Sequence, residues 1–240
     1  MKILALDSSG LVAGVAVIQD EIMLASYTIN YKKTHSQTLL PMLEELSKMI
    51  ELDMETIDAI AVAAGPGSFT GLRIGSATAK GLGLALHKPI VEIGTVEAIA
   101  YQLYGVEKII CPMLDARRNQ VYTGLYTFES MDGKSAFRTL MEQCAVSVEE
   151  LIDKVNETGK QVIFLGDGVP VYEAVIKEQT KVPYEFAPAY CNRQNAGALG
   201  VLACDYFKKK KFVAASEHKP EYLRMSQAER ERLEKEEKKQ

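Results

Sequence analysis

The chain has 240 residues, 47% of them hydrophobic and 25% charged, which is ordinary for a globular protein of one large domain or two small ones. Its formal net charge of −4 argues against a dedicated nucleic-acid-binding protein. No apolar run approaches the ~20 residues of a membrane span, and the first residues lack the apolar core of a signal peptide, so we expect a cytoplasmic protein with no membrane segment. The four cysteines are scattered without a C-x-x-C pair, which is typical of reduced thiols.

The first part of the chain predicts three strands in an antiparallel meander, followed by helices alternating with strands. The expected strands are 2–7, 12–18, 22–29, 57–64 and 89–93, and the expected helices are 36–51, 70–86 and 95–103. Pro41 is expected near the first turn of its helix, where proline is tolerated, and Thr95 is expected to cap the third helix.

The same order of elements then returns. Expected strands at 109–115, 119–128, about 137–144 and 161–165 alternate with helices 147–155 and 171–179, and a further helix is expected over 195–207. A βββαβα unit thus occurs twice, which predicts an α/β fold of two duplicated lobes, the second reduced. We expect the lobes to span 1–105 and 106–225, followed by a charged tail over 226–240 that is frayed or disordered.

A glycine-rich stretch from Ala64 to Gly75, A-G-P-G-S-F-T-G-L-R-I-G, stands between a predicted strand and a predicted helix. Two interpretations are open. The helix N-terminus could bind an anion, with Ser68 or Thr70 as its cap, or the glycines could simply make the corner. The spacing matches neither G-x-x-x-x-G-K-[ST] nor G-x-G-x-x-G, which favours the corner.

Five sequence blocks carry a family resemblance. They are D-S-S at Asp7–Ser9, H-S-Q-T-L-L-P at His35–Pro41, the G-P-G-S-F-T-G-L-R-I-G block at Gly65–Gly75, D-A-R-R-N-Q-V-Y at Asp115–Tyr122 and P-E-Y-L-R at Pro220–Arg224. In this order they resemble the TsaB (YeaZ) family, within an actin-like ATPase superfamily whose ribonuclease H-like lobes arise from a repeated βββαβα unit.

The resemblance implies a role in making threonylcarbamoyladenosine in tRNA, at the adenosine 3′ of the anticodon. It implies a non-catalytic, activating subunit that binds the paralogue TsaD, joins TsaE in a larger complex, pairs with itself when alone, and meets tRNA only indirectly. No cofactor is expected to bind tightly, and ATP with magnesium is expected only within the complex. The alternatives are an ATP-dependent kinase or ATPase of the actin-like superfamily and, less favoured, a metallopeptidase-like hydrolase.

The residues themselves offer little chemistry. A helical metal site commonly needs two histidines at i and i+4, but Leu39 stands four residues after His35, so we expect no metal site and assign His35 to hydrogen bonding at the helix start. We name no catalytic residue, because no serine has an evident His–acid partner. The candidate anion or nucleotide contacts are Asp7, Ser68, Arg73, Arg117 and Arg118, with one of the two adjacent arginines expected to point to each side.

A partner surface is predicted on the two N-terminal helices. Small residues at intervals of four form a stripe that lets another helix approach closely, and three apolar side chains of the first helix are expected to point partly outward. The predicted interface residues are Leu40, Met42, Met49, Gly71, Gly75, Ala79 and Gly83.

Overall fold

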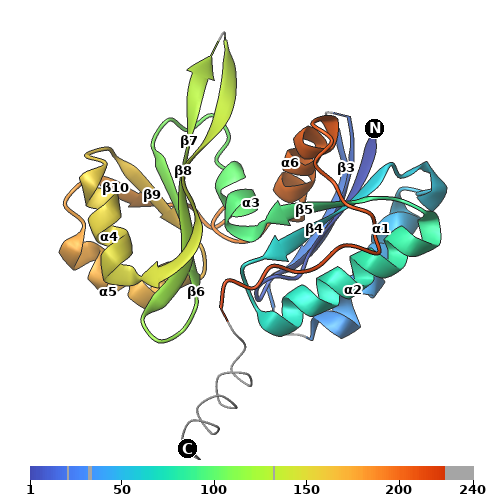
Figure 1. The fold of residues 1–240 in the computed structure, drawn as a ribbon, viewed down its shortest axis with the longest axis horizontal. Coiled ribbons are helices and arrows are strands. Elements are labelled where there is room, and N and C mark those ends of the chain that lie inside the picture. The colour runs from blue at the N-terminus through green and yellow to red at the C-terminus, as the bar shows by residue number, and fades with distance from the viewer. Residues whose placement is uncertain (21, 32–33, 132, 225–240) are drawn as a thin grey trace, which may run out of the picture.

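The computed structural model describes residues 1–20, 22–31, 34–131 and 133–224. It stacks five layers: two helices, a sheet, two further helices, a second sheet and two outer helices (Figure 1). The predicted tail, 226–240, lies outside the described residues.

The first sheet has the strand order β3-β2-β1-β4-β5. Its strands are β1 (Lys2–Asp7), β2 (Ala13–Gln19), β3 (Ile22–Ile29), β4 (Ala59–Gly65) and β5 (Ile90–Gly94). The first three pair antiparallel, as the predicted meander requires, while β4 and β5 run parallel to β1. Because β1 and β4 are buried on both faces, they are almost continuously apolar.

Helices α1 (His35–Met49) and α2 (Phe69–Leu86) cover one face of this sheet. A short 3₁₀ turn, Met54–Thr56, precedes β4. The buried positions of α1 are Leu39, Met42, Leu43 and Leu46, which pack with alternate residues of β1 and β2. Pro41 lies in the second turn of α1, which begins at His35, and not near the first turn as predicted.

The second sheet repeats the order of the first as β8-β7-β6-β9-β10. Its strands are β6 (Ile109–Asp115), β7 (Gln120–Met131), β8 (Lys134–Ser147), β9 (Val162–Leu165) and β10 (Tyr184–Phe186), the last of which we did not predict. Helices α4 (Val148–Glu157) and α5 (Gly168–Gln179) cover its outer face, and Ser147 caps α4 by accepting a hydrogen bond from the Glu150 N–H.

Helices α3 (Thr95–Tyr101) and α6 (Ala196–Lys208) lie between the two sheets. α6 packs on β1 and β2, while α3 packs on β6 and β7, so one apolar cluster joins both halves. The boundary near Gly105 separates the two sheets, but assigning all of 106–225 to the second lobe is wrong, because α6 returns to the first. Thr95 does not cap α3: Gly94 is the N-cap residue and the Thr95 side chain is buried.

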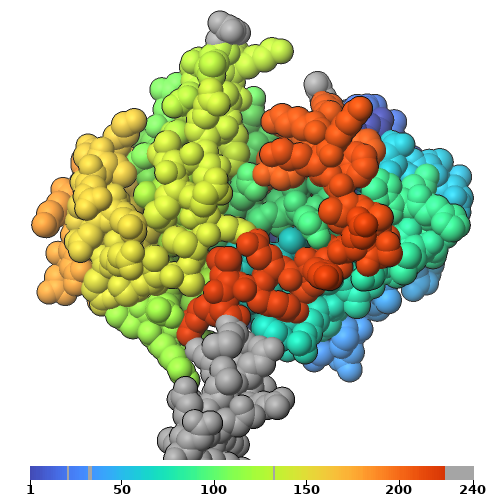
Figure 2. All heavy atoms as spheres, in the orientation of Figure 1, coloured from blue at the N-terminus to red at the C-terminus, as the bar shows by residue number. Residues whose placement is uncertain are grey.

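The segment after α6, residues 209–224, crosses the front of the molecule in Figure 2 and forms hydrogen bonds to both lobes. Val213 pairs with Ile90, and the Glu221 N–H donates to the Ala64 carbonyl at 2.7 Å. Arg224 Nη1 donates to the Ala116 carbonyl in the second lobe at 2.6 Å. The P-E-Y-L-R block therefore belongs to an interlobe connection.

Candidate functional site

A cleft of about 530 Å³ lies between the lobes, next to the carboxyl ends of strands β1, β4 and β6. Both lobes supply its lining, which is the usual place for a ligand in an open α/β sheet. The first lobe contributes Ser9, Gly10, Leu11, Gly67, Ser68 and Phe69, and the remainder are Leu114, Asp115, Ala116, Arg117, Tyr122, Asp167, Gln194 and Arg224.

The N-terminus of α2 is packed directly on the β1–β2 turn. The Ser68 N–H donates to the Ser9 carbonyl at 2.6 Å, and Ser8 Oγ donates to the Gly71 carbonyl at 2.9 Å. A Cβ on Gly67 would lie 2.2 Å from the Ser9 oxygen, so only glycine permits this approach. Ser68 also caps the helix by accepting from the Gly71 N–H. These contacts support the corner interpretation of the glycine-rich stretch.

Asp7, the first candidate contact, is buried behind this turn and does not line the cleft. Its Oδ1 accepts hydrogen bonds from the N–H and the hydroxyl of Ser9, at 2.9 and 2.7 Å. Burial raises the pKa of the Asp7 carboxyl, and the bonds from Ser9 partly oppose that rise. His35 also contacts this turn: its Nε2 donates a hydrogen bond to the Gly10 carbonyl at 2.7 Å, in agreement with the expected hydrogen bonding of His35 at the helix start.

Two acidic residues, Asp115 and Asp167, lie close together on the second-lobe side. Asp167 Oδ1 accepts from the Asp115 N–H at 3.0 Å, and Asp115 Oδ1 accepts from the Arg117 N–H and the Tyr172 hydroxyl. Burial raises the pKa of the Asp167 carboxyl, while the Asp115 N–H and the Arg193 charge lower it. Asp167 was visible in the sequence only as part of a turn, so its approach to Asp115 was missed.

The three candidate arginines are not brought together. Arg117 lines the cleft with its Nε 3.6 Å from Asp115, whereas Arg118 is exposed and outside the lining. The prediction that these two alternate along a strand is wrong, because φ is positive at both and at Asn119, which makes a left-handed turn between β6 and β7. Arg73 lies over the Phe69 ring at 4.4 Å and donates to the Tyr222 hydroxyl.

Gln194 is a cleft residue that sequence reasoning missed. It is 3% exposed, it packs on Gly10, and its Nε2 has no hydrogen-bond partner among the described residues. A lone glutamine in a loop gives no sequence signal, because its position depends on α6 returning to the first lobe.

The cleft does not fit the phosphates of a nucleotide well. The Ser68 N–H already donates to the Ser9 carbonyl, so it is not available to a phosphate. The Asp7 carboxyl is buried behind the β1–β2 turn and does not line the cleft, and the described lining contains no lysine. Over the ranges that the structure covers, no three His, Cys, Asp or Glu side chains are grouped so that they could hold a metal ion. The cleft therefore offers polar groups to a small ligand but no assembled phosphate cradle.

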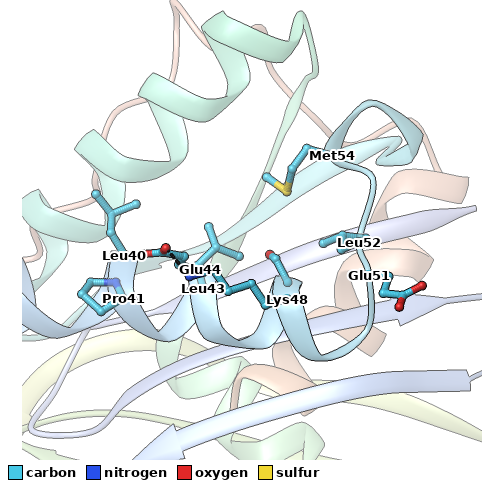
Figure 3. A pocket seen from close by; sticks show the side chains of 9 residues that line it. Leu40, Pro41, Leu43, Glu44, Lys48, Glu51, Leu52 and Met54 are labelled. Atoms are coloured by element: carbon cyan, nitrogen blue, oxygen red, sulfur yellow. Dashed lines mark hydrogen bonds and ion pairs between the residues drawn. The ribbon is translucent and has the colours of Figure 1, made fainter.

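The exposed face of α1 and α2 is the second candidate site. An apolar groove of about 710 Å³ runs along α1 to the loop that ends at Met54 (Figure 3). Leu40 is 53% exposed, Met49 78% and Leu84, on α2, 52%. Met42 is 3% exposed and packs on the sheet, so its predicted outward orientation is wrong.

The predicted small-residue stripe faces inward, which corrects the prediction that it faces a partner. Gly71, Gly75, Ala79 and Gly83 are all buried, because they let α2 lie against the β1–β2 turn, Val62 and Ala215. A different set of small residues faces outward at the same spacing. Its members are Ala77, Gly81 and Ala85.

No helix in the described part of the chain is long and apolar enough to cross a bilayer.

Two lobes of equal strand order, with a cleft at the carboxyl ends of their central strands, define an actin-like α/β protein. The TsaB proteins of Bacillus subtilis (strain 168) and Escherichia coli (strain K12) are 30% and 26% identical, over 95% and 93% of this chain and 96% and 95% of their own. The chain therefore belongs to the TsaB (YeaZ) family.

Two further comparisons agree with this assignment. A sequence model described as TsaD: tRNA N6-adenosine threonylcarbamoyltransferase matches residues 23–232. The solved structure of YeaZ from Pseudomonas aeruginosa superimposes with a TM-score of 0.79 at 27% identity, covering 92% of this chain and 99% of its own. The lobes predicted from the repeated βββαβα unit are thus those of a known relative.

Proposed function

We propose that this chain is a non-catalytic, activating subunit of the complex that installs threonylcarbamoyl on N6 of the adenosine 3′ of the anticodon in tRNA, and that it acts in the cytoplasm by binding TsaD. The observation that carries the proposal is the similarity, along 95% of the chain, to a protein named for tRNA threonylcarbamoyladenosine biosynthesis. A non-catalytic role is supported by the cleft, because its described lining contains no lysine and the Ser68 N–H, which could meet a phosphate, already donates to the Ser9 carbonyl.

The proposed TsaD-binding surface is the outer face of α1 and α2. Leu40, Met49 and Leu84 supply exposed apolar area, and Ala77 and Gly81 let a partner helix approach closely. Two such helices from each protein would form a four-helix contact. A stable contact of this kind buries ~1,200–2,000 Å² in total. In a two-fold homodimer each copy would use this same face, so self-pairing and TsaD binding should compete.

Reconstitution tests the proposal. Unmodified tRNA is incubated with TsaC, TsaD, TsaE, ATP, magnesium and this chain, and the modified nucleoside is quantified after digestion. Modification should require both TsaD and this chain, and omission of TsaD should abolish it. Modification that proceeds without TsaD would show that the chain is itself the transferase.

The alternative is an ATP-dependent kinase or ATPase, which the position of the interlobe cleft favours. The cleft chemistry argues against it, since no phosphate cradle is assembled, and we propose that ATP with magnesium is bound only within the complex that also contains TsaE. Calorimetric titration of the isolated chain with ATP and magnesium separates the two. Tight binding with turnover would support the enzyme.

A further inference from the structure

The C-terminal end of α6 carries four consecutive lysines that neither the cleft nor the α1–α2 face uses. Lys208 to Lys211 are all exposed. Lys211 differs from the others, because its ammonium lies 4.9 Å from the centre of the Tyr206 ring and lines a pocket that contains Glu97. Lys208, Lys209 and Lys210, with the neighbouring Phe212, are here called the α6-end patch.

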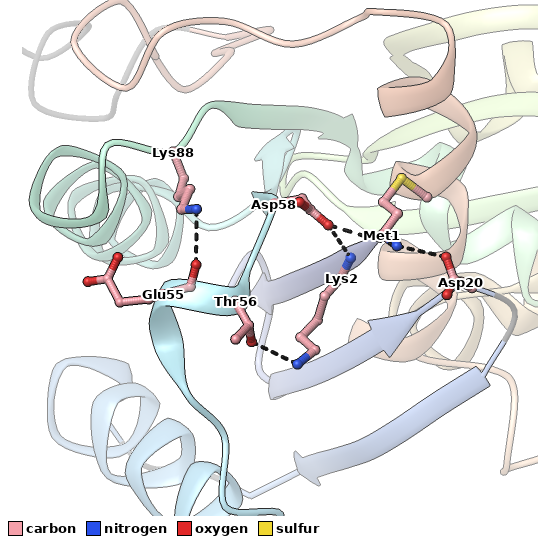
Figure 4. Close-up of polar contacts among 7 residues, drawn as sticks. All are labelled: Met1, Lys2, Asp20, Glu55, Thr56, Asp58 and Lys88. Atoms are coloured by element: carbon pink, nitrogen blue, oxygen red, sulfur yellow. Dashed lines mark hydrogen bonds and ion pairs between the residues drawn. The ribbon is translucent and has the colours of Figure 1, made fainter.

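Two carboxylates at this end of the first sheet are engaged in other contacts. Asp20 accepts a hydrogen bond from the Met1 amino group at 2.7 Å, and Asp58 accepts one from the Lys2 N–H at 2.6 Å (Figure 4). In the portion of the chain that is described, no ion pair joins the three patch lysines to an acid. Their charge is therefore available to a ligand, although the whole chain has a net charge of −4.

The backbone of the patch is one that normally favours glycine. The Lys210 N–H donates to the Phe207 carbonyl and the Lys211 N–H to the Tyr206 carbonyl, which is the Schellman motif at a helix end. Lys210 holds φ at 58°, in the left-handed region. A lysine near a helix C-terminus can be explained by its favourable interaction with the helix dipole. Lys208 already supplies such a charge in the last turn of α6, so the dipole does not explain why a lysine also occupies the left-handed position 210.

An exposed aromatic ring lies beside these lysines. Phe212 is 42% exposed and stacks on Phe207, with ring centres 5.1 Å apart and planes inclined by 29°. Together with Met1, Asp58, Lys208 and Lys210, the two rings line a shallow hollow of about 780 Å³. Ammonium groups that neutralise phosphates, next to an aromatic face on which a base can stack, are the combination by which proteins hold single-stranded nucleic acid.

We propose that the α6-end patch binds RNA, with the lysines on the phosphates and Phe212 against an unpaired base, so that this chain contacts the tRNA directly. The inference rests on the proposed function, which supplies tRNA as the partner. The α6-end patch would also remain exposed to solvent when TsaD binds the outer face of α1 and α2, as proposed above. α6 packs on the face of the first sheet opposite α1 and α2, and the patch shares its hollow with Met1 at the amino end of β1, away from the cleft.

The test is binding of an unmodified tRNA transcript to the full-length chain, followed by fluorescence anisotropy from about 50 to about 200 mM salt. The triple variant Lys208→Gln, Lys209→Gln, Lys210→Gln should bind about tenfold more weakly at ~100 mM salt, with a log–log salt slope smaller by about two, because three phosphate contacts are lost. Phe212→Leu should weaken binding about fivefold, because it keeps an apolar contact to Phe207 but removes the stacking ring.

The matched control is Lys134→Gln, Lys160→Gln, Lys181→Gln, which changes the net charge equally at exposed sites of the second lobe. It should bind as the unsubstituted chain does. Equal losses in both triple variants, no binding of tRNA by the unsubstituted chain at ~50 mM salt, or patch-dependent binding to phosphatidylserine vesicles without effect on tRNA would overturn the inference. Affinity for TsaD, measured on the same variants without tRNA, reports separately on the proposed function.

Discussion

Gly71→Ala tests the packing of α2 on the β1–β2 turn. The added Cβ would lie 2.0 Å from the Ser8 carbonyl oxygen, so the helix must move away from the turn. Overpacking of this kind costs about 1–3 kcal/mol, and the loss of the hydrogen bond from Ser8 Oγ to the Gly71 carbonyl adds about 1 kcal/mol. The better helix propensity of alanine returns about 1 kcal/mol. We expect the free energy of unfolding to fall by about 2 kcal/mol, a substantial part of the ~5–15 kcal/mol typical of a domain.

Gly81→Ala is the matched control on the same helix. A Cβ at Gly81 meets nothing within 4 Å, so only the propensity term acts and the variant should be about 0.5–1 kcal/mol more stable. Urea unfolding followed by circular dichroism measures both changes. If Gly71→Ala proves as stable as the unsubstituted chain, or Gly81→Ala is destabilised, then α2 does not pack as described.

Three further predictions concern stability. Because burial raises the pKa of Asp7, the free energy of unfolding should decrease as pH rises above the ordinary aspartate pKa of 3.8 and through the folded pKa; Asp7→Asn should flatten that decrease in urea titrations repeated over this pH range. Asn195→Ala should lower stability by about 1 kcal/mol, because Asn195 Oδ1 caps α6 by accepting from two backbone N–H groups, and Asn195→Ser should restore most of it. Lys210→Gly should raise the melting temperature slightly by relieving the left-handed lysine, and a lower value would refute that strain.

The order of elements could be predicted because each strand or helix carries its own periodicity and bounding turns. The buried apolar run of β1 and the amphipathic α4 are of this kind. What could not be predicted depends on contacts between distant segments: the return of α6 to the first lobe, and the short edge strand β10, which is held by pairing with β9.

The same reason explains the errors at the sites. Local spacing identified a small-residue stripe on α2 but could not say which of its two stripes faces the sheet, since both repeat every four residues. The predicted stripe is the inward one, because its Gly71 and Gly75 are what the close approach to Ser8 requires. Likewise, Arg117 and Arg118 follow a strand-like run, and only the left-handed turn shows that they leave it.

The most direct test of the central proposal is the affinity of this chain for TsaD, measured by isothermal titration calorimetry with a matched pair of variants. Ala77→Arg places a charged, bulky side chain on the outer face of α2, and Val201→Arg places the same side chain on the exposed surface of α6, across the sheet. We predict that TsaD binds the unsubstituted chain and the Val201→Arg variant alike but does not bind Ala77→Arg, with all three folded by circular dichroism. Undiminished binding of TsaD to a folded Ala77→Arg variant would contradict the proposed role of the α1–α2 face.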